Sequence, residues 1–256
     1  MGDPLRSLRA SPIDRALLPL HRWVWQDAGR CARKLLRFAE TEADGGRDLS
    51  RAAEVTADPL LRRLFLRHAQ DEERHARLFR ARSRELFRTL AGEAATGRAP
   101  GFEANFLAPG ERGLDDLHIE SETDESLLAF LHLSEQAAAR RFVIYQEALE
   151  HDPGTRDVFR EILHDEAFHM SYTHAQLARI AGARTRRRIW QARLGRLWKA
   201  YLRMAAALAG VLGSLLLRIQ YFVLLPPFVF LARRAARREP EGFSPSRALP
   251  DARSQY

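Results

Sequence analysis

Cysteine is nearly absent from this sequence, since its 256 residues contain only Cys31. A single thiol excludes an intrachain disulfide, a cysteine-based zinc site and a CxxC redox pair. Such a composition is compatible with a reducing compartment. We expect Cys31 to be a small buried hydrophobic residue and not a functional thiol.

The first 20 residues lack a long apolar run, because Pro4, Pro12, Pro19 and Asp14 interrupt them. They predict an N-terminal extension, residues 1–20, and no secretory signal. Over the whole chain 46% of the residues are apolar, which argues against wholesale disorder. The length indicates one substantial domain with an appendage, or two small domains.

Runs of β-branched residues are scarce after the N-terminal extension, and apolar residues recur at steps of three and four. This periodicity predicts an all-α fold. Asp58-Pro59 and Asp152-Pro153 each predict a helix start, because aspartate caps a helix and proline is tolerated in its first turn. Gly182 predicts a helix end. We expect four long helices, at residues 21–56, 59–90, 123–150 and 153–181.

Residues 92–122 hold several glycines and prolines without helical periodicity, so they predict a long connection. Two tight turns and one long crossover are typical of a four-helix bundle made of two helical hairpins. We assign this bundle to residues 21–182.

The two predicted hairpins resemble each other when the first is shifted by 94 residues. Each carries a Glu-x-x-His sequence, Glu72 to His75 and Glu166 to His169, that begins 14 residues after the aspartate of its Asp-Pro pair. Residues three apart lie on one face of a helix, so the carboxylate and the imidazole can bind one metal ion together. Two copies at the same spacing are much stronger evidence than one.

A dimetal site in a bundle also needs one carboxylate from each of the other two helices. Glu72 and Glu166 lie about 21 Å beyond their hairpin turns, so each partner must lie about as far before the turn. Glu135 and Glu42 meet this condition, at 17 and 16 residues before the aspartates of the Asp-Pro pairs. We prefer Glu42 to Glu40 because Glu42 shares its helical face with apolar residues.

Six side chains thus make up the predicted metal site: Glu42, Glu72, His75, Glu135, Glu166 and His169. The ordinary alternative is that glutamates and histidines on helices are solvated or form salt bridges. Here the same faces carry core residues, and four acids with two histidines at one depth of an apolar bundle would be strongly destabilising without compensation. The pattern therefore favours a pair of bound metal ions.

The order Glu, Glu-x-x-His, Glu, Glu-x-x-His resembles the ferritin-like diiron-carboxylate superfamily, over about residues 30–180. The Asp-Pro hairpins are similar to the rubrerythrin and bacterial ferritin-like branch. The run from Asp71 to His75, which includes Arg74, is similar to the Asp-Glu-x-Arg-His run of diiron oxygenases and oxidases. The aspartate of that run orients a ligand histidine, which the resemblance implies for Asp71 and Asp165.

The chain departs from rubrerythrins in lacking the four cysteines of a rubredoxin-like iron site, and Phe168 stands where a second arginine would be expected. Tyr145 and Tyr172 lie on ligand faces, either as hydrogen-bonding or redox-active neighbours of the metals or as ordinary core residues. His68 and His132 have the same two interpretations, and neither is assigned as a ligand.

The resemblance implies two iron ions, with manganese or a mixed Mn/Fe pair as alternatives, and the reduction of O2 or peroxide. The first interpretation is a membrane-tethered oxidase or oxygenase of an organic substrate that takes electrons from an external donor. The alternatives are rubrerythrin-like peroxide reduction or ferroxidase activity, and a non-catalytic structural or sensor bundle. A homodimer is compatible with each.

Beyond Gly182 the sequence changes to a basic run with interleaved tryptophans, an apolar stretch from Met204 to Leu231, and a second basic cluster. Basic and aromatic residues beside a long apolar run are typical of membrane anchors. We therefore assign residues 183–238 to a segment that associates with lipid on the cytoplasmic side of a membrane. Arg218 within the apolar run weighs against a simple span.

Three membrane arrangements remain open: a hairpin that turns near Pro226-Pro227, a tilted single span, and an interfacial helix. The soluble alternative is a fifth helix that packs on the bundle or forms an oligomer. Although the net charge is +8, the arginines flank an apolar run and do not line a polar face, so nucleic acid is not expected as a partner. Residues 239–256 predict a disordered tail.

Overall fold

The computed structural model describes residues 8, 10–91 and 119–237, and every regular element in these ranges is a helix. The all-α prediction is confirmed for this part of the chain. Two compact units divide the chain, Met1–Gly195 and Arg196–Tyr256. The helices of the first unit are α1 (Pro12–Ala16), α2 (Leu18–Gln26), α3 (Ala28–Val55), α4 (Pro59–Ala91), α5 (Asp124–Ala148) and α6 (Pro153–Ala181).

The first predicted helix is in fact two helices. We expected one helix over residues 21–56, but the chain breaks at Asp27, whose backbone is extended (φ −91°, ψ 118°). The Asp27 carboxylate accepts a hydrogen bond of 2.7 Å from the backbone N–H of Arg30 and so caps α3. Aspartate favours such a capping position over a helix interior, which explains the break. Helix α1 and the start of α2 lie within the predicted extension.

Both helix starts predicted from the Asp-Pro pairs are confirmed. Helix α4 begins at Pro59 and α6 at Pro153. The Asp58 carboxylate accepts a hydrogen bond of 2.8 Å from the backbone N–H of Leu60, and Asp152 accepts one of 3.0 Å from that of Thr155. The predicted end of the fourth helix is also confirmed, because Gly182 follows α6 with a positive φ of 53° that glycine adopts without strain.

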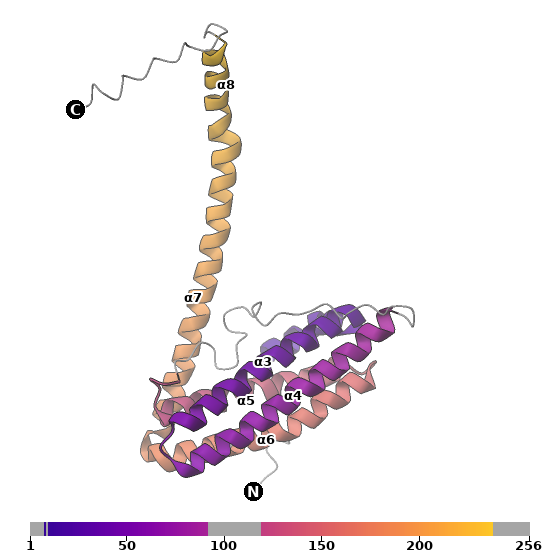
Figure 1. Ribbon diagram of the computed structural model, residues 1–256, viewed down its shortest axis with the longest axis vertical. Coiled ribbons are helices and arrows are strands. Elements are labelled where there is room, and N and C mark those ends of the chain that lie inside the picture. The colour runs from indigo at the N-terminus through magenta and orange to yellow at the C-terminus, as the bar shows by residue number, and fades with distance from the viewer. Residues whose placement is uncertain (1–7, 9, 92–118, 238–256) are drawn as a thin grey trace, which may run out of the picture. The chain divides into compact units, whose positions relative to one another are not determined.

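The four long helices lie alongside one another in Figure 1, with α3 against α4 and α5 against α6. They enclose two apolar clusters. One contains Leu49, Phe65, Leu128 and Leu177, and the other contains Leu35, Phe79, Phe142 and Phe159. On α3, α4 and α5 the predicted metal ligands fall between the residues of these two clusters, and on α6 they lie where the two clusters meet. The polar site therefore lies within an apolar interior. Cys31 is buried in the second cluster, as expected.

The C-terminal segment stays helical where a hairpin turn was one of the predicted arrangements. After the short 3-10 turn η3 (Gly182–Arg184), α7 runs over Thr185–Ile219 and continues through a π-helical turn, η4 (Gln220–Leu224), into α8 (Leu225–Ala236). Pro226 and Pro227 lie in the first turn of α8. A hairpin near these prolines is therefore wrong. The reason is that proline fits a helical first turn, and the preceding π-helical turn accommodates the missing N–H groups.

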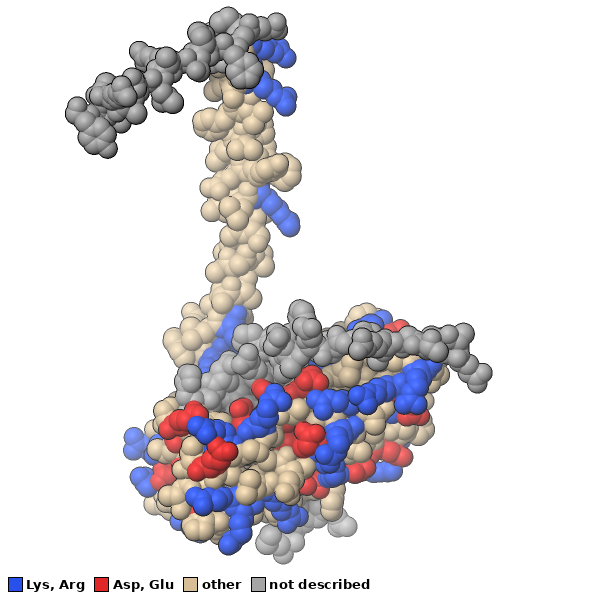
Figure 2. Space-filling model, in the orientation of Figure 1, with Lys and Arg blue, Asp and Glu red and all other residues tan. Residues whose placement is uncertain are grey.

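In the second unit, no residue that the structure describes is buried. Its exposed apolar side chains include Leu208, Leu212, Leu216 and Phe222. Figure 2 shows mostly uncharged residues along this helix, with a few Lys and Arg side chains. One helix in the described residues is long and apolar enough to cross a membrane. Most of the predicted 92–122 connection and the predicted tail at 239–256 lie outside the described residues.

The capping contacts predict a stability effect at Asp152. Its carboxylate caps α6 and also forms an ion pair of 2.7 Å with Arg82 on α4, and both side chains are mostly buried. We expect Asp152→Ala to lower the free energy of unfolding by about 2 kcal/mol, because a cap and a charged hydrogen bond are lost together. Urea denaturation measures this change.

The matched control is Asp157→Ala on the same helix. Asp157 pairs with Arg160 at 2.7 Å, but both side chains are more than half exposed. Exposed pairs of this kind contribute less than about 1 kcal/mol. Equal losses in the two variants would show that the Asp152 contacts do not hold the hairpins together.

Candidate metal centre

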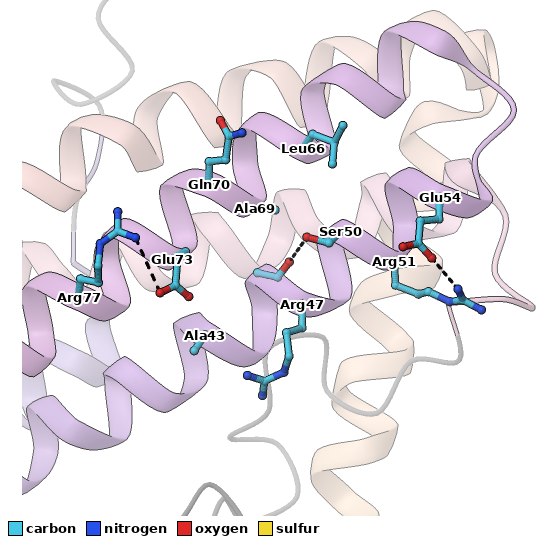
Figure 3. Close-up of a pocket in the computed structure, with 11 residues that line it drawn as sticks. Ala43, Arg47, Ser50, Arg51, Glu54, Leu66, Ala69, Gln70, Glu73 and Arg77 are labelled. Atoms are coloured by element: carbon cyan, nitrogen blue, oxygen red, sulfur yellow. Dashed lines mark hydrogen bonds and ion pairs between the residues drawn. The ribbon is translucent and has the colours of Figure 1, made fainter.

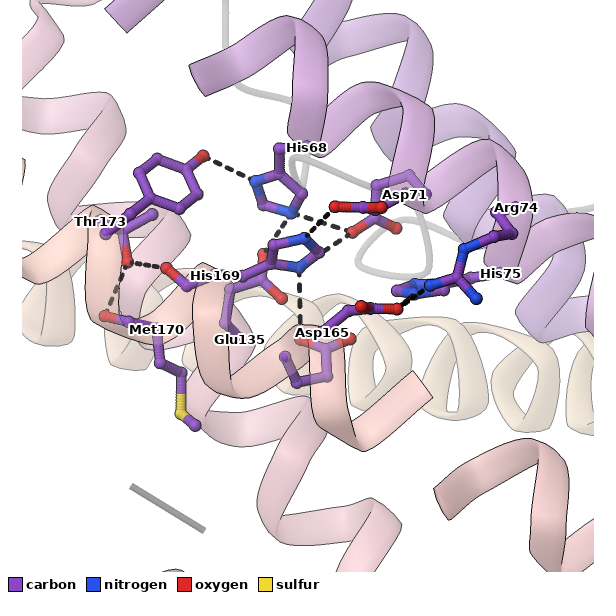
Figure 4. A network of polar contacts seen from close by, with 12 residues as sticks. His68, Asp71, Arg74, His75, Glu135, Asp165, His169, Met170 and Thr173 are labelled. Carbon is purple, nitrogen blue, oxygen red and sulfur yellow. Dashed lines mark hydrogen bonds and ion pairs between the residues drawn. The ribbon is translucent and has the colours of Figure 1, made fainter. Parts of the chain in front are cut away.

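The structure brings the predicted ligands together in two overlapping groups. Figure 4 shows His75, Glu135 and His169 among them, with His68, Asp71 and Asp165 nearby. In the first, Glu42, Glu72 and His75 each offer one ligand atom, and these atoms lie within 4.8 Å of one another. In the second, Glu72, Glu135 and His169 do the same, together with His68. Glu72 belongs to both groups, so the two lie side by side. This arrangement has the form of two adjacent metal positions with a shared carboxylate.

Glu166, the sixth predicted ligand, lies beside the second group. Its Oε2 atom is 3.9 Å from Nδ1 of His169, and its side chain is buried. Five of the six predicted ligands are buried, and Glu42 is partly buried.

The structure separates Glu42 from Glu40 as predicted. Glu40 forms an ion pair of 3.0 Å with Arg80 on α4, whereas Glu42 faces Glu72 and His75. The two side chains are two residues apart on α3 and therefore point in nearly opposite directions.

Each histidine predicted to be a ligand contacts an aspartate of the other hairpin. Nε2 of His75 lies 3.0 Å from Oδ2 of Asp165, and Nε2 of His169 lies 3.3 Å from Oδ2 of Asp71. An N–H donated from Nε2 to a carboxylate leaves Nδ1 unprotonated in a neutral ring. The Nδ1 lone pair of each histidine is then available for a metal ion, the usual arrangement for a histidine ligand.

Three buried atoms at this site have no hydrogen-bond partner: Nδ1 of His75, Nδ1 of His169 and Oε2 of Glu166. They are three of the five such side-chain atoms in the part of the chain that the structure describes. Buried polar atoms are otherwise almost always paired, because an unpaired one costs about 1–3 kcal/mol. All three belong to predicted ligands, so the donor set fits a metal ion.

The carboxyl groups of the site have raised pKa values. Burial raises the pKa of Glu42, Glu72 and Glu135 well above the ordinary value, and neighbouring carboxylates raise the pKa further. Burial also raises the pKa of Glu166, to about 8, and lowers the pKa of His75 to about 3. A group of like charges in a dry interior therefore favours neutral forms unless cations compensate it.

Arg74 makes the two halves of the site unequal. It forms an ion pair with Asp165 and another of 2.7 Å with Glu161, so it braces the aspartate that holds His75. The equivalent position in the second hairpin is Phe168, whose ring instead receives the guanidinium of Arg67 at 4.2 Å. Phe168 therefore cannot brace Asp71 in the way that Arg74 braces Asp165.

A glycine on α3 allows this helix to approach the site closely. A Cβ atom on Gly46 would lie 3.2 Å from the Ala69 carbonyl oxygen and 3.4 Å from Cβ of Glu72. An open groove between α3 and α4 has Gly46 and Ala69 in its lining, with the Arg77–Glu73 and Arg51–Glu54 ion pairs among its residues (Figure 3). Gly46 therefore lies both in the lining of the groove and against the side chain of Glu72.

His68 is the residue at this site that the sequence did not assign. Its side chain is fully buried, and Nε2 lies 2.9 Å from Oε1 of Glu72 and 3.5 Å from Oε1 of Glu135. Its Nδ1 lies 2.7 Å from the hydroxyl of Tyr172. The signal that could have found it is its position four residues before Glu72, on the same helical face. Tyr172 thus lies beside the ligands, as one of its two interpretations predicted.

Two other candidates lie away from the cluster. Tyr145 packs among aromatic rings, with its centroid 5.0 Å from that of Trp25 and 5.6 Å from that of Phe159. The structure therefore does not bring Tyr145 to the ligands, because ten residues along a helix separate it from Glu135 by about 15 Å. Nδ1 of His132 faces the backbone carbonyl of Met170 at 3.2 Å.

Comparison of this chain with protein-family models, with curated proteins and with solved structures gives no match.

The raised pKa of Glu166 predicts a pH effect on the metal-free protein. Between pH 4.5 and about 8 the folded protein binds this proton more tightly than the unfolded chain, so the free energy of unfolding falls as pH rises. The lowered pKa of His75 acts in the opposite direction, but only below about pH 6.5. From pH 6.5 to 8 we expect Glu166 to contribute a loss of up to about 2 kcal/mol, and the raised pKa of Glu42, Glu72 and Glu135 to add to this loss. Urea denaturation in the presence of a chelator measures the change.

Glu166→Gln removes the contribution of this carboxyl and should make the loss of stability between pH 6.5 and 8 smaller. Asp157→Asn, which changes an exposed carboxyl on the same helix that pairs with Arg160, should leave the slope unaltered. A metal-free protein that gains stability over this range would contradict the assignment of a protonated carboxyl to the site.

Proposed function

We propose that residues 21–182 form a ferritin-like four-helix bundle that holds two metal ions, and that the protein is a diiron oxidoreductase. The proposed ligands are Glu42, Glu72, His75, Glu135, Glu166 and His169. The observation that carries this proposal is the set of three unpartnered ligand atoms, two of them on histidines whose other nitrogen is held by an aspartate.

Charge balance supports two ions in preference to one. Four ionised glutamates carry four negative charges, and the histidines are neutral when they bind a metal. Two divalent cations would neutralise these four charges at the place where burial otherwise favours protonated carboxyl groups. A set of carboxylates with few imidazoles suits iron or manganese better than copper, and we favour iron.

Different residues of the chain would have different roles at this centre. An iron pair, when bound, supplies electrons for the reduction of O2 or peroxide. Asp71 and Asp165 fix the ring orientation and tautomer of the histidines, and Arg74 holds Asp165. The apolar clusters on either side exclude water. The substrate is expected to be organic, with an external electron donor.

Metal content tests the ligand assignment. We expect about two iron or cobalt ions per chain in the wild-type protein, and a loss of at least one ion in Glu42→Ala because a carboxylate ligand is removed. Glu40→Ala is the matched control, since Glu40 lies two residues away and pairs with Arg80. Elemental analysis after gel filtration measures the ratio.

Each outcome of this experiment has a separate meaning. Equal metal content in the two variants would contradict the assignment of Glu42. No metal in the wild-type protein would contradict the dimetal centre as a whole. Two bound ions without consumption of O2 or peroxide in the presence of a reductant would favour a structural or sensor role over an oxidoreductase.

We also propose that the C-terminal helix anchors the protein to the cytoplasmic side of a membrane. The supporting observation is the run of exposed apolar side chains from Met204 to Leu231, with arginines on both sides. An apolar surface of this length in water favours burial in lipid or against another chain. Positive flanks would contact anionic headgroups.

Flotation with vesicles of phosphatidylcholine and phosphatidylserine tests this anchor. We expect the full chain to float with the vesicles in high salt, and the double variant Leu212→Glu/Leu216→Glu to remain in solution, because two charges are costly in a bilayer. Leu66→Glu is the control, since Leu66 is an exposed leucine of α4. A full chain that stays soluble without detergent and does not float would refute the anchor.

A further inference from the structure

The internal repeat is broken at two residues that touch each other. A shift of 94 residues pairs every proposed histidine ligand with its counterpart, but it places His68 on Ile162 and Tyr172 on Leu78. His68 and Tyr172 are nevertheless joined by a hydrogen bond of 2.7 Å. The two halves of the centre therefore differ through a connected pair of polar side chains, on α4 and α6.

His68 faces the proposed ligands with one nitrogen. Nε2 lies 2.9 Å from Oε1 of Glu72 and 3.5 Å from Oε1 of Glu135, so it points between two carboxylates on different helices. The ring also lies over that of His169, with the centroids 3.6 Å apart and the planes inclined by 30°. In Figure 4 the His68 and His169 rings lie next to each other within the cluster.

The hydroxyl of Tyr172, which contacts Nδ1 of His68, can form a hydrogen bond with either tautomer of the His68 ring. Without metal, Nε2–H can donate to Glu72 while Nδ1 accepts from the hydroxyl of Tyr172. With metal, Nε2 must offer a lone pair, and the ring proton moves to Nδ1. A tyrosine hydroxyl can donate or accept, so Tyr172 satisfies Nδ1 in both states, whereas a carboxylate could only accept.

We propose, on the basis of the dimetal centre proposed above, that His68 is a third histidine ligand, bound through Nε2 to the metal ion that Glu135 and His169 hold. Tyr172 is a positioning residue that orients the His68 ring. The two metal positions are then unequal, with one imidazole from His75 at the first and two imidazoles at the second. The position with two imidazoles binds divalent cobalt more tightly and fills first.

Proton NMR of the cobalt-loaded full chain tests this proposal, because the ring N–H of each metal-bound histidine gives a strongly shifted signal that exchanges with solvent. We expect three such signals in the wild-type protein and two in His68→Gln. Titration with Co2+ should show one of the two ions bound at least roughly 10-fold more weakly in His68→Gln. Tyr172→Phe should retain all three signals, with that of His68 moved.

His132→Gln is the matched control, since His132 lies three residues before Glu135 but faces the backbone of Met170. It should retain three signals and the wild-type affinities. Two signals in the wild-type protein, or three in His68→Gln, would overturn the proposal while leaving the dimetal centre intact. A wild-type protein that binds no cobalt would overturn the dimetal centre and the proposal together. The wild-type count decides the question even if His68→Gln does not fold.

Discussion

Four glutamate side chains at one level of an apolar interior are the constraint on which the rest of this molecule depends. Burial raises the pKa of all four, so each must be protonated or neutralised by a cation. The two apolar clusters on either side hold the helices rigidly enough to keep the carboxyl groups together. The crossed His75–Asp165 and His169–Asp71 contacts then fix the nitrogens that face this group.

The two halves of the site are similar in their backbone pattern and different in their surroundings. Arg74 braces one aspartate, and the equivalent Phe168 cannot brace the other. Conversely, His68 and Tyr172 add polar groups beside His169, the histidine whose aspartate is not braced by an arginine in this way. In the proposed dimetal centre, such differences would make the two metal positions distinguishable.

Helical periodicity and the Asp-Pro pairs predicted the long helices and their starts, because capping is a local effect that the sequence carries directly. Glu42 could be chosen over Glu40 for the same reason, since a helical face follows from spacing alone. The break at Asp27 was missed, because a cap within a periodic stretch competes with helix continuation. His68 lies four residues before Glu72 on the same helical face, a signal that was not used to assign it. The roles of Asp71 and Asp165 followed from the resemblance, but their exchange between the hairpins depends on contacts between helices, which spacing within one helix does not encode. The prediction of a hairpin turn at Pro226-Pro227 was wrong, because proline permits a helix start as readily as a turn.

The exchange of aspartates couples the orientation of each histidine to the packing of the whole bundle. Asp71 of the first hairpin contacts His169 of the second, and Asp165 of the second contacts His75 of the first. Neither hairpin alone contains both members of a contact. The nitrogens that face the carboxyl groups are therefore fixed only when the two hairpins have come together, so the site and the docking of the hairpins form in one step.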